Sequence, residues 1–390
     1  MYRMGKEEIE SVARVINAQA LFKINDTEKD AMHAEEEMKA LFGCENAIVM
    51  SSGHAALESA LVAMGVGPGD EVIVPAYTYI ATAMTVVAAG AMPVIADVDE
   101  TLTLSPSAFE AAITEHTKAV IPVHIQGFPC AMDKICEIAK KHGIKVLEDA
   151  CQADGGAFLG KRLGTWGDAG ALSFNYYKII SAGEGGALLT DNREIFERAL
   201  IYHDSSAVAY FGKQMSDFST EIFCGAEYRT NGISCAILRE QMKKMDSIIF
   251  DLRKNKKYVM DRIADVCDFL PSNDIEGDCG TTVAVRFDSA EAALAFAEAD
   301  GVCGWSPINT GKHVYTNWTP IMNKRGALNP LMDPFKMEAN RDIVPDYKAD
   351  MCKKTLELLA RTVYIAVNPD WTEKQMDELI ASIKSAVQKR

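Results

Sequence analysis

The strongest constraint on the fold is an alternation of short apolar segments and helical patterns between residues 50 and 200. Six segments rich in Val, Ile, Leu or Ala are bounded by Gly, Pro or Asp, as strands of a buried sheet are: 71–77, 92–99, 119–125, 145–150, 170–177 and 186–192. Helical patterns separate several of them, over 54–66, 79–90, 107–117 and 132–143. The alternation predicts an α/β fold with a mainly parallel sheet covered on both faces.

Chain length and one long helical pattern predict two domains. With 390 residues, the chain exceeds the usual size of a single domain. A helical pattern over 236–266 is too long for a helix that merely covers a sheet, so we expect it to link two units. We place a large domain with an N-terminal helical arm at residues 1–240. The linking helix and a smaller α/β domain, in which 302–350 is rich in loops, take residues 241–390.

Charge and composition indicate a small-molecule ligand. The 40 basic and 55 acidic residues leave a net charge of −15, which opposes non-specific binding to nucleic acid or to anionic membranes. No apolar run has the length of a membrane span, and the N-terminal segment is acidic and amphipathic, unlike a secretory signal. The ten cysteines have no metal-like spacing. We therefore expect a cytoplasmic protein with free thiols and no metal.

Two motifs at predicted strand ends could bind a ligand. Ser52, Gly53 and His54 lie between an apolar segment and a helix, where the free N–H groups of the first helical turn can bind an anion. Asp149 lies at the carboxyl end of a buried strand, the edge where α/β sheets bind ligands. Each motif has a purely structural alternative, since Ser and Asp are both common helix caps.

A lysine completes the pattern. Lys178 follows another predicted strand and stands among apolar and aromatic residues that could desolvate its ammonium group and make it a nucleophile: Phe174, Tyr176, Tyr177, Ile179 and Ile180. The alternative is a solvated surface charge. Pyridoxal phosphate needs a lysine for its aldehyde, a carboxylate for its pyridine nitrogen and an anion site for its phosphate. The three motifs meet these needs together.

The runs SSGHAAL, GPGDEVIVPAYTYIATA, GAMPVIADVD, EDACQA and SFNYYKIISAGEGGALLT resemble the DegT/StrS-type family of pyridoxal-phosphate-dependent sugar aminotransferases. The resemblance extends over nearly the whole chain and is densest between residues 43 and 195. It implies a fold type I aminotransferase architecture, working as a homodimer with the active site between the subunits.

By this resemblance, Lys178 bonds to the cofactor aldehyde, Asp149 pairs with the pyridine nitrogen and Gln152 approaches the ring hydroxyl. Tyr79 matches the aromatic residue that stacks on the ring, although a core aromatic is the plain alternative. The phosphate would be held by the 52–54 turn and by Ser173.

Two positions depart from the family pattern. His54 replaces the usual Thr, but it can still donate its backbone N–H and a ring proton. Glu227 replaces an asparagine that reaches across the dimer to the cofactor phosphate. A carboxylate there would repel the phosphate, so we expect Glu227 to turn away or to pair with Arg229.

The resemblance implies transfer of an amino group from glutamate or glutamine to a keto or aldehyde sugar, either a nucleotide sugar or a keto-sugar acid, with the cofactor cycling between pyridoxal and pyridoxamine phosphate. One alternative is a sugar dehydratase that uses the same cofactor, but such relatives carry histidine in place of Lys178. The other is a non-catalytic regulatory protein, which only the altered Glu227 favours.

Overall fold

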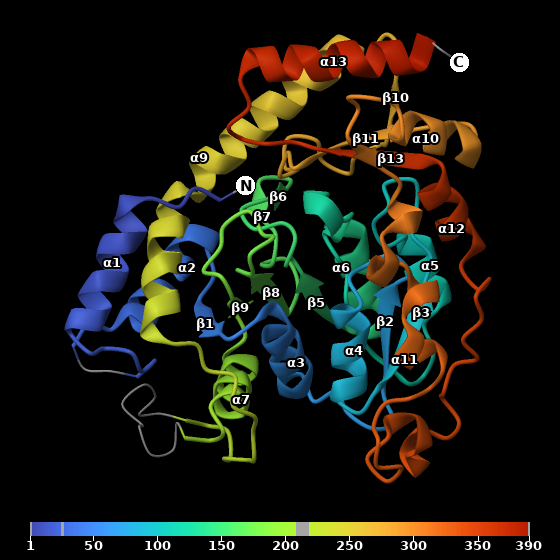
Figure 1. Ribbon diagram of the computed structural model, residues 1–390. Helices are drawn as coiled ribbons and strands as arrows, with labels where there is room; N and C mark the ends of the chain where they lie inside the picture. The colour runs from blue at the N-terminus through green and yellow to red at the C-terminus, as the bar shows by residue number, and fades with distance from the viewer. Residues whose placement is uncertain (1, 25–26, 208–217, 389–390) are drawn as a thin grey trace.

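The computed structural model describes residues 2–24, 27–207 and 218–388 and contains a large seven-stranded sheet at its centre (Figure 1). The strand order is β1-β9-β8-β5-β4-β2-β3. Neighbours from β8 to β3 are parallel, while β9 runs antiparallel to both β1 and β8. The strands are β1 (Asn46–Met50), β2 (Glu71–Pro75), β3 (Met92–Ala96), β4 (Thr117–Val120), β5 (Lys145–Asp149), β8 (Ala169–Ser173) and β9 (Gly186–Thr190). The six strands predicted between residues 50 and 200 are therefore confirmed.

Helices cover both faces of this sheet because adjacent residues of a strand point to opposite sides. In β1, Val49 belongs to one apolar core and Ile48 to the other, and in β9 Leu189 and Leu188 divide in the same way. One core includes residues of α2 (Asp30–Phe42), α5 (Pro106–Ala111) and α6 (Met132–His142); the other includes residues of α3 (Gly53–Ala63), α4 (Ala81–Ala88) and α7 (Arg193–His203). The predicted α/β class with both faces covered is confirmed.

One long helix, α9 (Gly232–Ile263), joins the two parts of the molecule (Figure 1). Its first half packs against α1 (Lys6–Asn17) and α2, and its second half packs against α13 (Glu373–Gln388). The boundary expected at residue 240 falls inside this helix, and the division into 1–240 and 241–390 stays a prediction.

The second, four-stranded sheet is antiparallel, in the order β10-β11-β13-β12. Its strands are β10 (Asp268–Phe269), β11 (Thr282–Arg286), β12 (Gly304–Trp305) and β13 (Thr362–Ala366), and α10 (Ala290–Ala297) and α12 (Lys353–Ala360) accompany them.

The 302–350 segment is rich in loops, as predicted, and it lies along the β3 edge of the large sheet. It contains α11 (Thr319–Met322) and the short 3₁₀ turns η2 (Pro307–Asn309), η3 (Gly311–His313), η4 (Tyr315–Asn317), η5 (Pro334–Lys336) and η6 (Glu338–Asn340). The buried Asn340 amide donates to the Gly90 carbonyl at 2.9 Å, and the Tyr347 hydroxyl donates to the Pro93 carbonyl at 2.7 Å. These bonds anchor the segment to the β3 edge of the large sheet.

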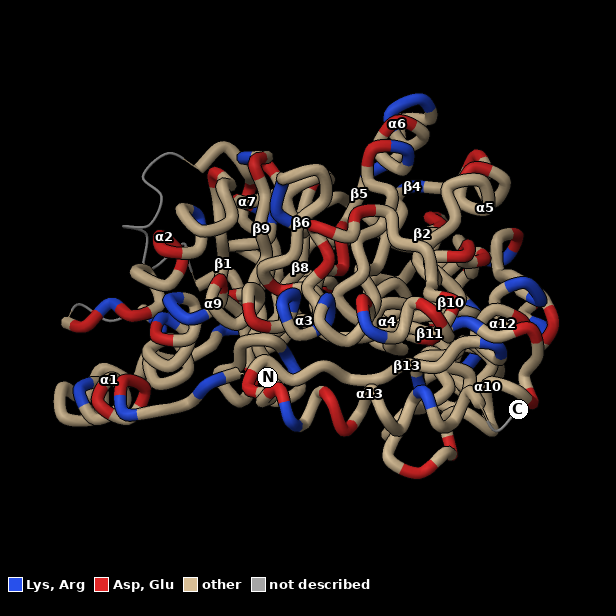
Figure 2. The backbone as a smooth tube through the Cα atoms, turned by 90° about the horizontal axis from the view of Figure 1, so that it is seen from above, with Lys and Arg blue, Asp and Glu red and all other residues tan. Residues whose placement is uncertain are grey.

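Acidic and basic residues are interspersed along the outer helices (Figure 2). Such a mixture differs from the basic stripe that proteins present to nucleic acid. Across the described residues, we find no helix with both the length and the apolarity to cross a membrane.

Candidate functional site

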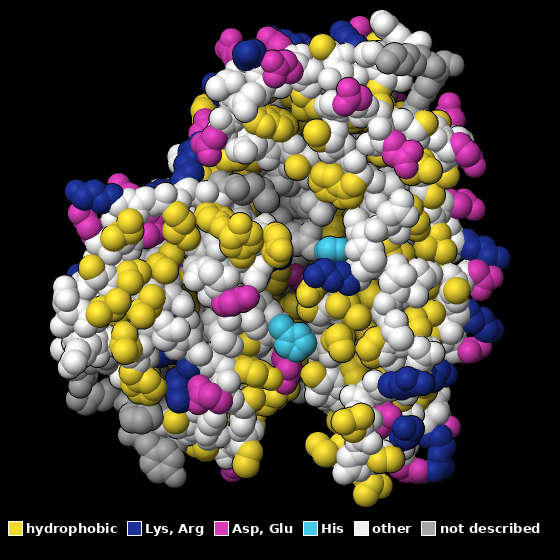
Figure 3. Space-filling view, in the orientation of Figure 1, with side chains coloured by type: hydrophobic (Ala, Val, Ile, Leu, Met, Phe, Trp, Pro, Cys, Tyr) yellow, Lys and Arg dark blue, Asp and Glu magenta, His cyan; other side chains and the backbone are white. Residues whose placement is uncertain are grey.

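Three strands end at the same edge of the large sheet and place the predicted site residues there. Because β1 and β8 both run antiparallel to β9, they point in the same direction as β5. The carboxyl ends of the three strands lead to Ser52, Asp149 and Ser173, respectively. The molecular surface is hollowed on this side, and His and Lys or Arg side chains lie at the edge of the hollow (Figure 3). This is the edge where ligands bind in α/β sheets.

Ser52 is the N-cap of α3, and its hydroxyl oxygen accepts the Ala55 N–H at 3.1 Å. Ser52 therefore caps α3, as the structural alternative in the sequence analysis expects. Because its oxygen only accepts in this bond, the hydroxyl proton remains free to donate to a ligand. Among the described residues, no acceptor pairs with the N–H of Gly53 or His54. The turn therefore presents two free donors at the positive end of a helix, which favours an anion.

Gly53 is required at this turn because other residues approach it closely. A Cβ atom there would lie 2.7 Å from Cys151 Sγ and 2.9 Å from the Ser173 Cβ. Gly186 of β9 is equally confined, since its Cβ would lie 2.5 Å from the Gly53 nitrogen. Because neither glycine has a side chain, the β1–α3 turn packs directly against the end of β8 and the beginning of β9. The anion site therefore lies next to Ser173.

The ring of His54 turns toward its own helix. Its Nε2 lies 3.5 Å from a carboxylate oxygen of the buried Glu58, which also accepts the hydroxyls of Tyr202 at 2.7 Å and Tyr228 at 2.9 Å. Although burial raises the pKa of Glu58, the hydrogen bonds from His54 and the two tyrosines hold it below its ordinary value. The ionised Glu58 carboxylate therefore holds the His54 ring beside the anion site.

Asp149, the last residue of β5, is buried, and both its carboxylate oxygens are oriented by the protein. Thr82 of α4 donates its hydroxyl to one of them at 2.7 Å, and the Cys151 N–H reaches the other at 3.2 Å. Thr82 is itself fully buried and 2.8 Å from the Thr78 hydroxyl. The carboxylate is therefore held in one orientation, as a partner for a cationic ring nitrogen must be.

Gln152 and Ser173 lie near Asp149 with unused hydrogen-bonding capacity. The Gln152 side-chain oxygen accepts the Gln126 N–H at 3.1 Å, which leaves the amide donors free to reach a ligand. Ser173 is buried at the end of β8, and among the described residues we find no hydrogen bond made by its hydroxyl. A hydroxyl in this position is a candidate donor to a bound phosphate.

Lys178 sits in a turn that follows β8, closed by its own N–H donating to the Asn175 carbonyl at 3.0 Å. The lysine is half-buried, and its charge acts on Cys151, Asp154 and His313, which belong to three different segments. The predicted apolar surroundings are only partly correct. Phe174, Ile179 and Ile180 are buried, but Tyr176 and Tyr177 are 61% and 78% exposed because their side chains leave the turn toward solvent.

Tyr79 is exposed at the start of α4, so the core-aromatic alternative is wrong. Its ring lies 5.6 Å from the ring of His313, and the Lys312 ammonium stands 4.9 Å from its centroid. Backbone bonds from Thr78 and Ile80 to the 312–313 carbonyls, at 2.9 and 3.0 Å, hold the two segments together. The 302–350 segment therefore brings one cation and one imidazole to the site.

Glu227 pairs with Arg229 at 2.7 Å, as the sequence analysis expects if it turns away from the phosphate. Arg229 also binds the buried Asp204, so it bridges two carboxylates. The side chain of Glu227 is half exposed and accepts a further bond from Ser205 at 3.4 Å. Its negative charge is thereby balanced within its own loop.

Sequence reasoning missed four residues that the fold brings to this site. Thr82 orients Asp149, Asp154 is fully buried with a pKa that the charge of Asp149 helps to raise, and Lys312 and His313 face Tyr79. A buried Thr in a helical pattern carries no sign of its partner, and an Asp before Gly155 and Gly156 has the appearance of an exposed turn residue. Their partners lie in other segments, so no local pattern could reveal them.

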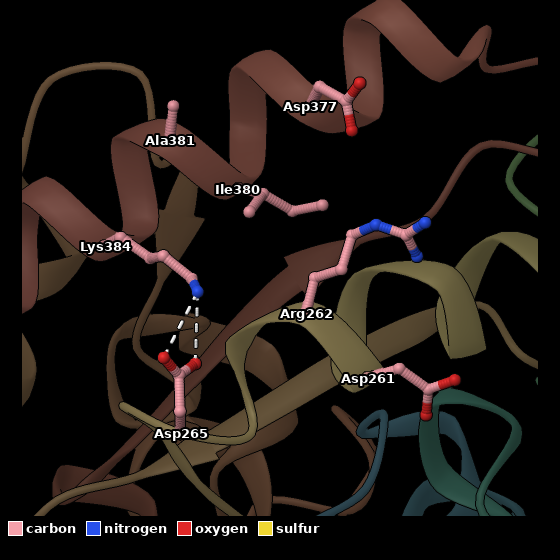
Figure 4. A pocket seen from close by; sticks show the side chains of 7 residues that line it. All are labelled: Asp261, Arg262, Asp265, Asp377, Ile380, Ala381 and Lys384. Atoms are coloured by element: carbon pink, nitrogen blue, oxygen red, sulfur yellow. Dashed lines mark hydrogen bonds and ion pairs between the residues drawn. The ribbon is translucent and has the colours of Figure 1, made fainter.

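A second hollow, between the end of α9 and α13, offers less chemistry (Figure 4). Its lining includes Lys384, which binds Asp265 at 3.1 Å, and Arg262, which stacks 3.4 Å from the ring centroid of Tyr258. These charges already have partners. Within the part of the chain that the structure describes, we find no cluster of three or more His, Cys, Asp or Glu side chains placed to hold a metal ion.

The residues at the sheet edge fit pyridoxal phosphate. The free N–H groups of the α3 turn, with the hydroxyls of Ser52 and Ser173, form a cradle for a phosphate in which no side chain could occupy the Gly53 position. The oriented carboxylate of Asp149 and the amine of Lys178 provide the two other groups that this cofactor needs.

Comparison with known proteins identifies a family. A model of the DegT/DnrJ/EryC1/StrS aminotransferase family matches residues 3–291. The match confirms the resemblance seen in the sequence and, with it, the expected cofactor. It includes β1, β5, β8 and α9, so it covers every predicted site residue.

The relatives agree with this match. The spore coat polysaccharide biosynthesis protein SpsC of Bacillus subtilis is 37% identical over 264 residues, 66% of this chain and 66% of its own length. The GDP-perosamine synthase of Caulobacter vibrioides is 41% identical over 207 residues, 52% of this chain and 54% of its own. The solved aminotransferase of Psychrobacter cryohalolentis superimposes with a TM-score of 0.80 at 24% identity, covering 100% of this chain and 98% of that one. The likeness to this aminotransferase confirms the expected fold.

Proposed function

Since the chain belongs to the DegT/DnrJ/EryC1/StrS aminotransferase family, we propose that it transfers an amino group from glutamate or glutamine to a keto or aldehyde sugar, with pyridoxal phosphate as cofactor. The observation that carries the proposal is the meeting of an oriented Asp149, an open anion turn at Ser52–His54 and the amine of Lys178 at one sheet edge. Both relatives named above act in the formation of sugar compounds, as their names state, which supports the acceptor class.

The roles of the residues follow from their positions. When bound, pyridoxal phosphate supplies an aldehyde that an amine can capture and a ring that accepts electrons from the substrate carbon. Asp149, oriented by Thr82, would keep a proton on the ring nitrogen. Ser52, Ser173 and the Gly53 and His54 N–H groups would bind the phosphate, and Gln152 would reach the ring hydroxyl with its free amide.

Lys178 would bond to the aldehyde at rest and, once displaced by the amino donor, move a proton between the substrate carbon and the cofactor C4′. The retained lysine disfavours the dehydratase alternative, whose members have histidine there. Tyr79 would cover one face of the ring, since it is exposed at the site and its ring already contacts that of His313.

The acceptor would bind between Tyr79 and the 310–314 segment. Among the described residues we find no ion-pair partner for Lys312, which stands over Tyr79, so it can face an anionic part of the acceptor. Burial lowers the pKa of His313, and the charges of Lys312 and Lys178 add to this effect, so His313 can accept a hydrogen bond as a neutral ring. Both nucleotide sugars and keto-sugar acids carry an anionic group of this kind.

Assembly and location belong to the same proposal. Tyr176 and Tyr177 expose large aromatic surfaces next to Lys178, and a second copy of the chain would cover them in a homodimer with shared sites. A cytoplasmic location is consistent with the ten free cysteines.

The test is amination of a panel of keto-sugars by the enzyme loaded with pyridoxamine phosphate. We expect product with at least one nucleotide sugar or keto-sugar acid, and none in Lys178→Ala, which should fold normally because its side chain is not a core element. Asp149→Asn should retain cofactor and lose most activity, because an amide cannot hold the ring nitrogen protonated. Full turnover in Lys178→Ala would refute the assignment of this lysine.

A further inference from the structure

Glu58 is a buried carboxylate on α3, one helical turn beyond His54 of the anion turn. Its two oxygens accept hydroxyl protons from two tyrosines, Tyr202 of α7 at 2.7 Å and Tyr228 at 2.9 Å. The oxygen that accepts from Tyr228 also lies 3.5 Å from the His54 ring. A carboxylate this close to an anion site opposes phosphate binding by its charge. A favourable role for Glu58 at the site must therefore be positional.

Tyr228 holds the anion turn through its backbone. The Ser51 N–H donates to the Tyr228 carbonyl at 2.8 Å, and the Tyr228 N–H donates to the carbonyl of His203, the last residue of α7, also at 2.8 Å. The last residue of β1 forms an isolated antiparallel bridge with Arg229. The segment around Tyr228 is thus fixed between the end of β1 and the end of α7.

Tyr228 therefore contacts the beginning of α3 on both sides of the anion site. Its carbonyl binds Ser51, immediately before the N-cap, and its hydroxyl binds Glu58, in the second turn of the helix. The free N–H groups of Gly53 and His54 lie between these two contacts along the chain. One residue outside the helix thereby helps to fix the direction in which both donors point.

Tyr202 belongs to the same cluster but has no such second contact. Its ring packs edge-on against that of Tyr228, with 6.1 Å between the centroids, and its hydroxyl binds the other oxygen of Glu58. Its backbone lies in α7, and within the described residues we find no hydrogen bond between Tyr202 and the 51–54 turn. Both tyrosines satisfy the carboxylate, but of the two it is Tyr228 that also bonds to the turn.

We propose that Tyr228, acting with Glu58, positions the anion turn for the phosphate group of the cofactor. The inference rests on the proposed function, in which this turn binds the phosphate of pyridoxal phosphate. Both residues act through the turn and are positioning residues, because a helix N-terminus binds an anion well when its free N–H groups are held in place. The segment thus keeps a link to the phosphate site although Glu227 turns away to Arg229.

The experiment compares two ligands that differ in the phosphate group. Pyridoxal phosphate and pyridoxal are titrated separately into the full-length, cofactor-free protein, and both dissociation constants are measured. Tyr228→Phe removes the hydroxyl and keeps the ring and the backbone bonds. We expect its dissociation constant for pyridoxal phosphate to rise about three- to tenfold, the range that a single hydrogen bond supplies. The constant for pyridoxal should stay unchanged, whereas a general loss of structure would weaken both ligands.

Tyr202→Phe is the matched control, because it removes a hydroxyl from the same carboxylate. Its affinity for pyridoxal phosphate should stay close to that of the wild type, since α7 still packs against α3 through the apolar core. Equal losses in Tyr202→Phe and Tyr228→Phe would show that the hydroxyls only compensate the charge of Glu58, and would overturn the proposal. An unchanged affinity for pyridoxal phosphate in Tyr228→Phe, or an equal loss for pyridoxal, would overturn it as well.

A double-variant cycle tests whether the Tyr228 hydroxyl acts through Glu58. Glu58→Met removes the acceptor and keeps a side chain of similar length. In this background, Tyr228→Phe should cause no further change in the affinity for pyridoxal phosphate. A full further loss would contradict the route through Glu58. Failure of sugar amination would leave all these dissociation constants unaffected, so the inference and the proposed function can fail separately.

Discussion

The Thr82 hydroxyl donates a 2.7 Å hydrogen bond to Oδ2 of Asp149 and so joins the start of α4 to the end of β5. Both residues are buried, so water cannot replace either partner easily. The bond fixes the orientation of the Asp149 carboxylate in the site, so α4 contributes to positioning Asp149.

We therefore expect Thr82→Val to weaken cofactor binding. Valine keeps the shape and removes the donor, so the Asp149 carboxylate loses one orienting bond, which is worth about 1.5–3 kcal/mol when the acceptor is charged. Equilibrium dialysis with pyridoxal phosphate measures the change. Thr85→Val is the control: Thr85 lies on the same helix and donates to the Thr82 carbonyl at 2.9 Å. Equal losses of cofactor affinity in both variants would contradict this role for Thr82.

Gly53→Ala should damage the anion turn. The new methyl group would lie 2.7 Å from Cys151 Sγ, so the turn or the ends of β8 and β9 must shift, at a cost of roughly 1–3 kcal/mol in unfolding free energy. We expect cofactor affinity to fall as well, because Ser173 is displaced from the turn. Gly67→Ala provides the comparison, since its Cβ would meet nothing closer than the Ala89 carbonyl at 4.0 Å. A Gly53→Ala protein as stable as this control would show that the close approach is unimportant.

Glu227→Asn should not reduce cofactor affinity. Glu227 pairs with Arg229 at 2.7 Å and is not needed to hold the phosphate; removing its charge leaves Arg229 bound to Asp204. Affinity should rise if asparagine regains a phosphate contact across a dimer and stay unchanged if the loop lies elsewhere. A clear fall in affinity, measured by cofactor titration, would mean that Glu227 itself helps to bind the cofactor.

Lys312→Ala should impair the acceptor half-reaction selectively. Lys312 stands 4.9 Å from the ring centroid of Tyr79, and its loss removes a cation from the proposed acceptor side. We expect the acceptor KM to rise on the order of tenfold, as for other functional charge contacts, with the donor half-reaction unchanged. Lys348→Ala, which removes an exposed lysine paired with Asp346 at 2.8 Å, should change neither half-reaction. A similar loss in both half-reactions of Lys312→Ala would refute the acceptor-side assignment.

His203 should make the fold sensitive to acid. Its buried ring accepts from the Lys23 ammonium at 2.9 Å and donates to the Leu200 carbonyl at 2.8 Å, an arrangement that requires the neutral form. Burial, followed by the charge of Lys23, lowers the pKa of His203 well below its ordinary value. The unfolded chain therefore binds a proton at His203 more tightly than the folded chain does. The contribution of His203 to the free energy of unfolding is fully present above about pH 6.5. It is lost as the pH falls toward the pKa of His203 in the folded state, by up to about 1.4 kcal/mol per pH unit.

Denaturant unfolding between pH 7 and 5 measures this loss. His203→Gln can donate to Leu200 and accept from Lys23 without titrating, so its stability should depend less on pH. His116→Gln, at an exposed position, should retain the wild-type dependence. If His203→Gln and the wild type lose stability in parallel, His203 is not the acid-sensitive group.

The sequence alone predicts the alternation of strands and helices and the positions of Ser52, Asp149 and Lys178 at or just beyond strand ends. These features are local: a buried strand is recognised by its apolar run, and the residues that follow it are read directly along the chain. Because strands that point in one direction end at one edge of a sheet, the pattern also predicts that the three motifs meet. The helical pattern of the long α9 is likewise contained within one segment.

Contacts between distant segments required the tertiary structure. Thr82 and Asp149 are 67 residues apart, and Lys312 reaches Tyr79 only because a largely irregular segment packs along the sheet edge. Asp154 is buried although an Asp before two glycines indicates an exposed turn. Tyr176 and Tyr177 are exposed although their apolar neighbours in the sequence indicate a buried segment. The physical reason is that solvent exposure and partner choice depend on how the elements pack against one another, a property that no local periodicity encodes.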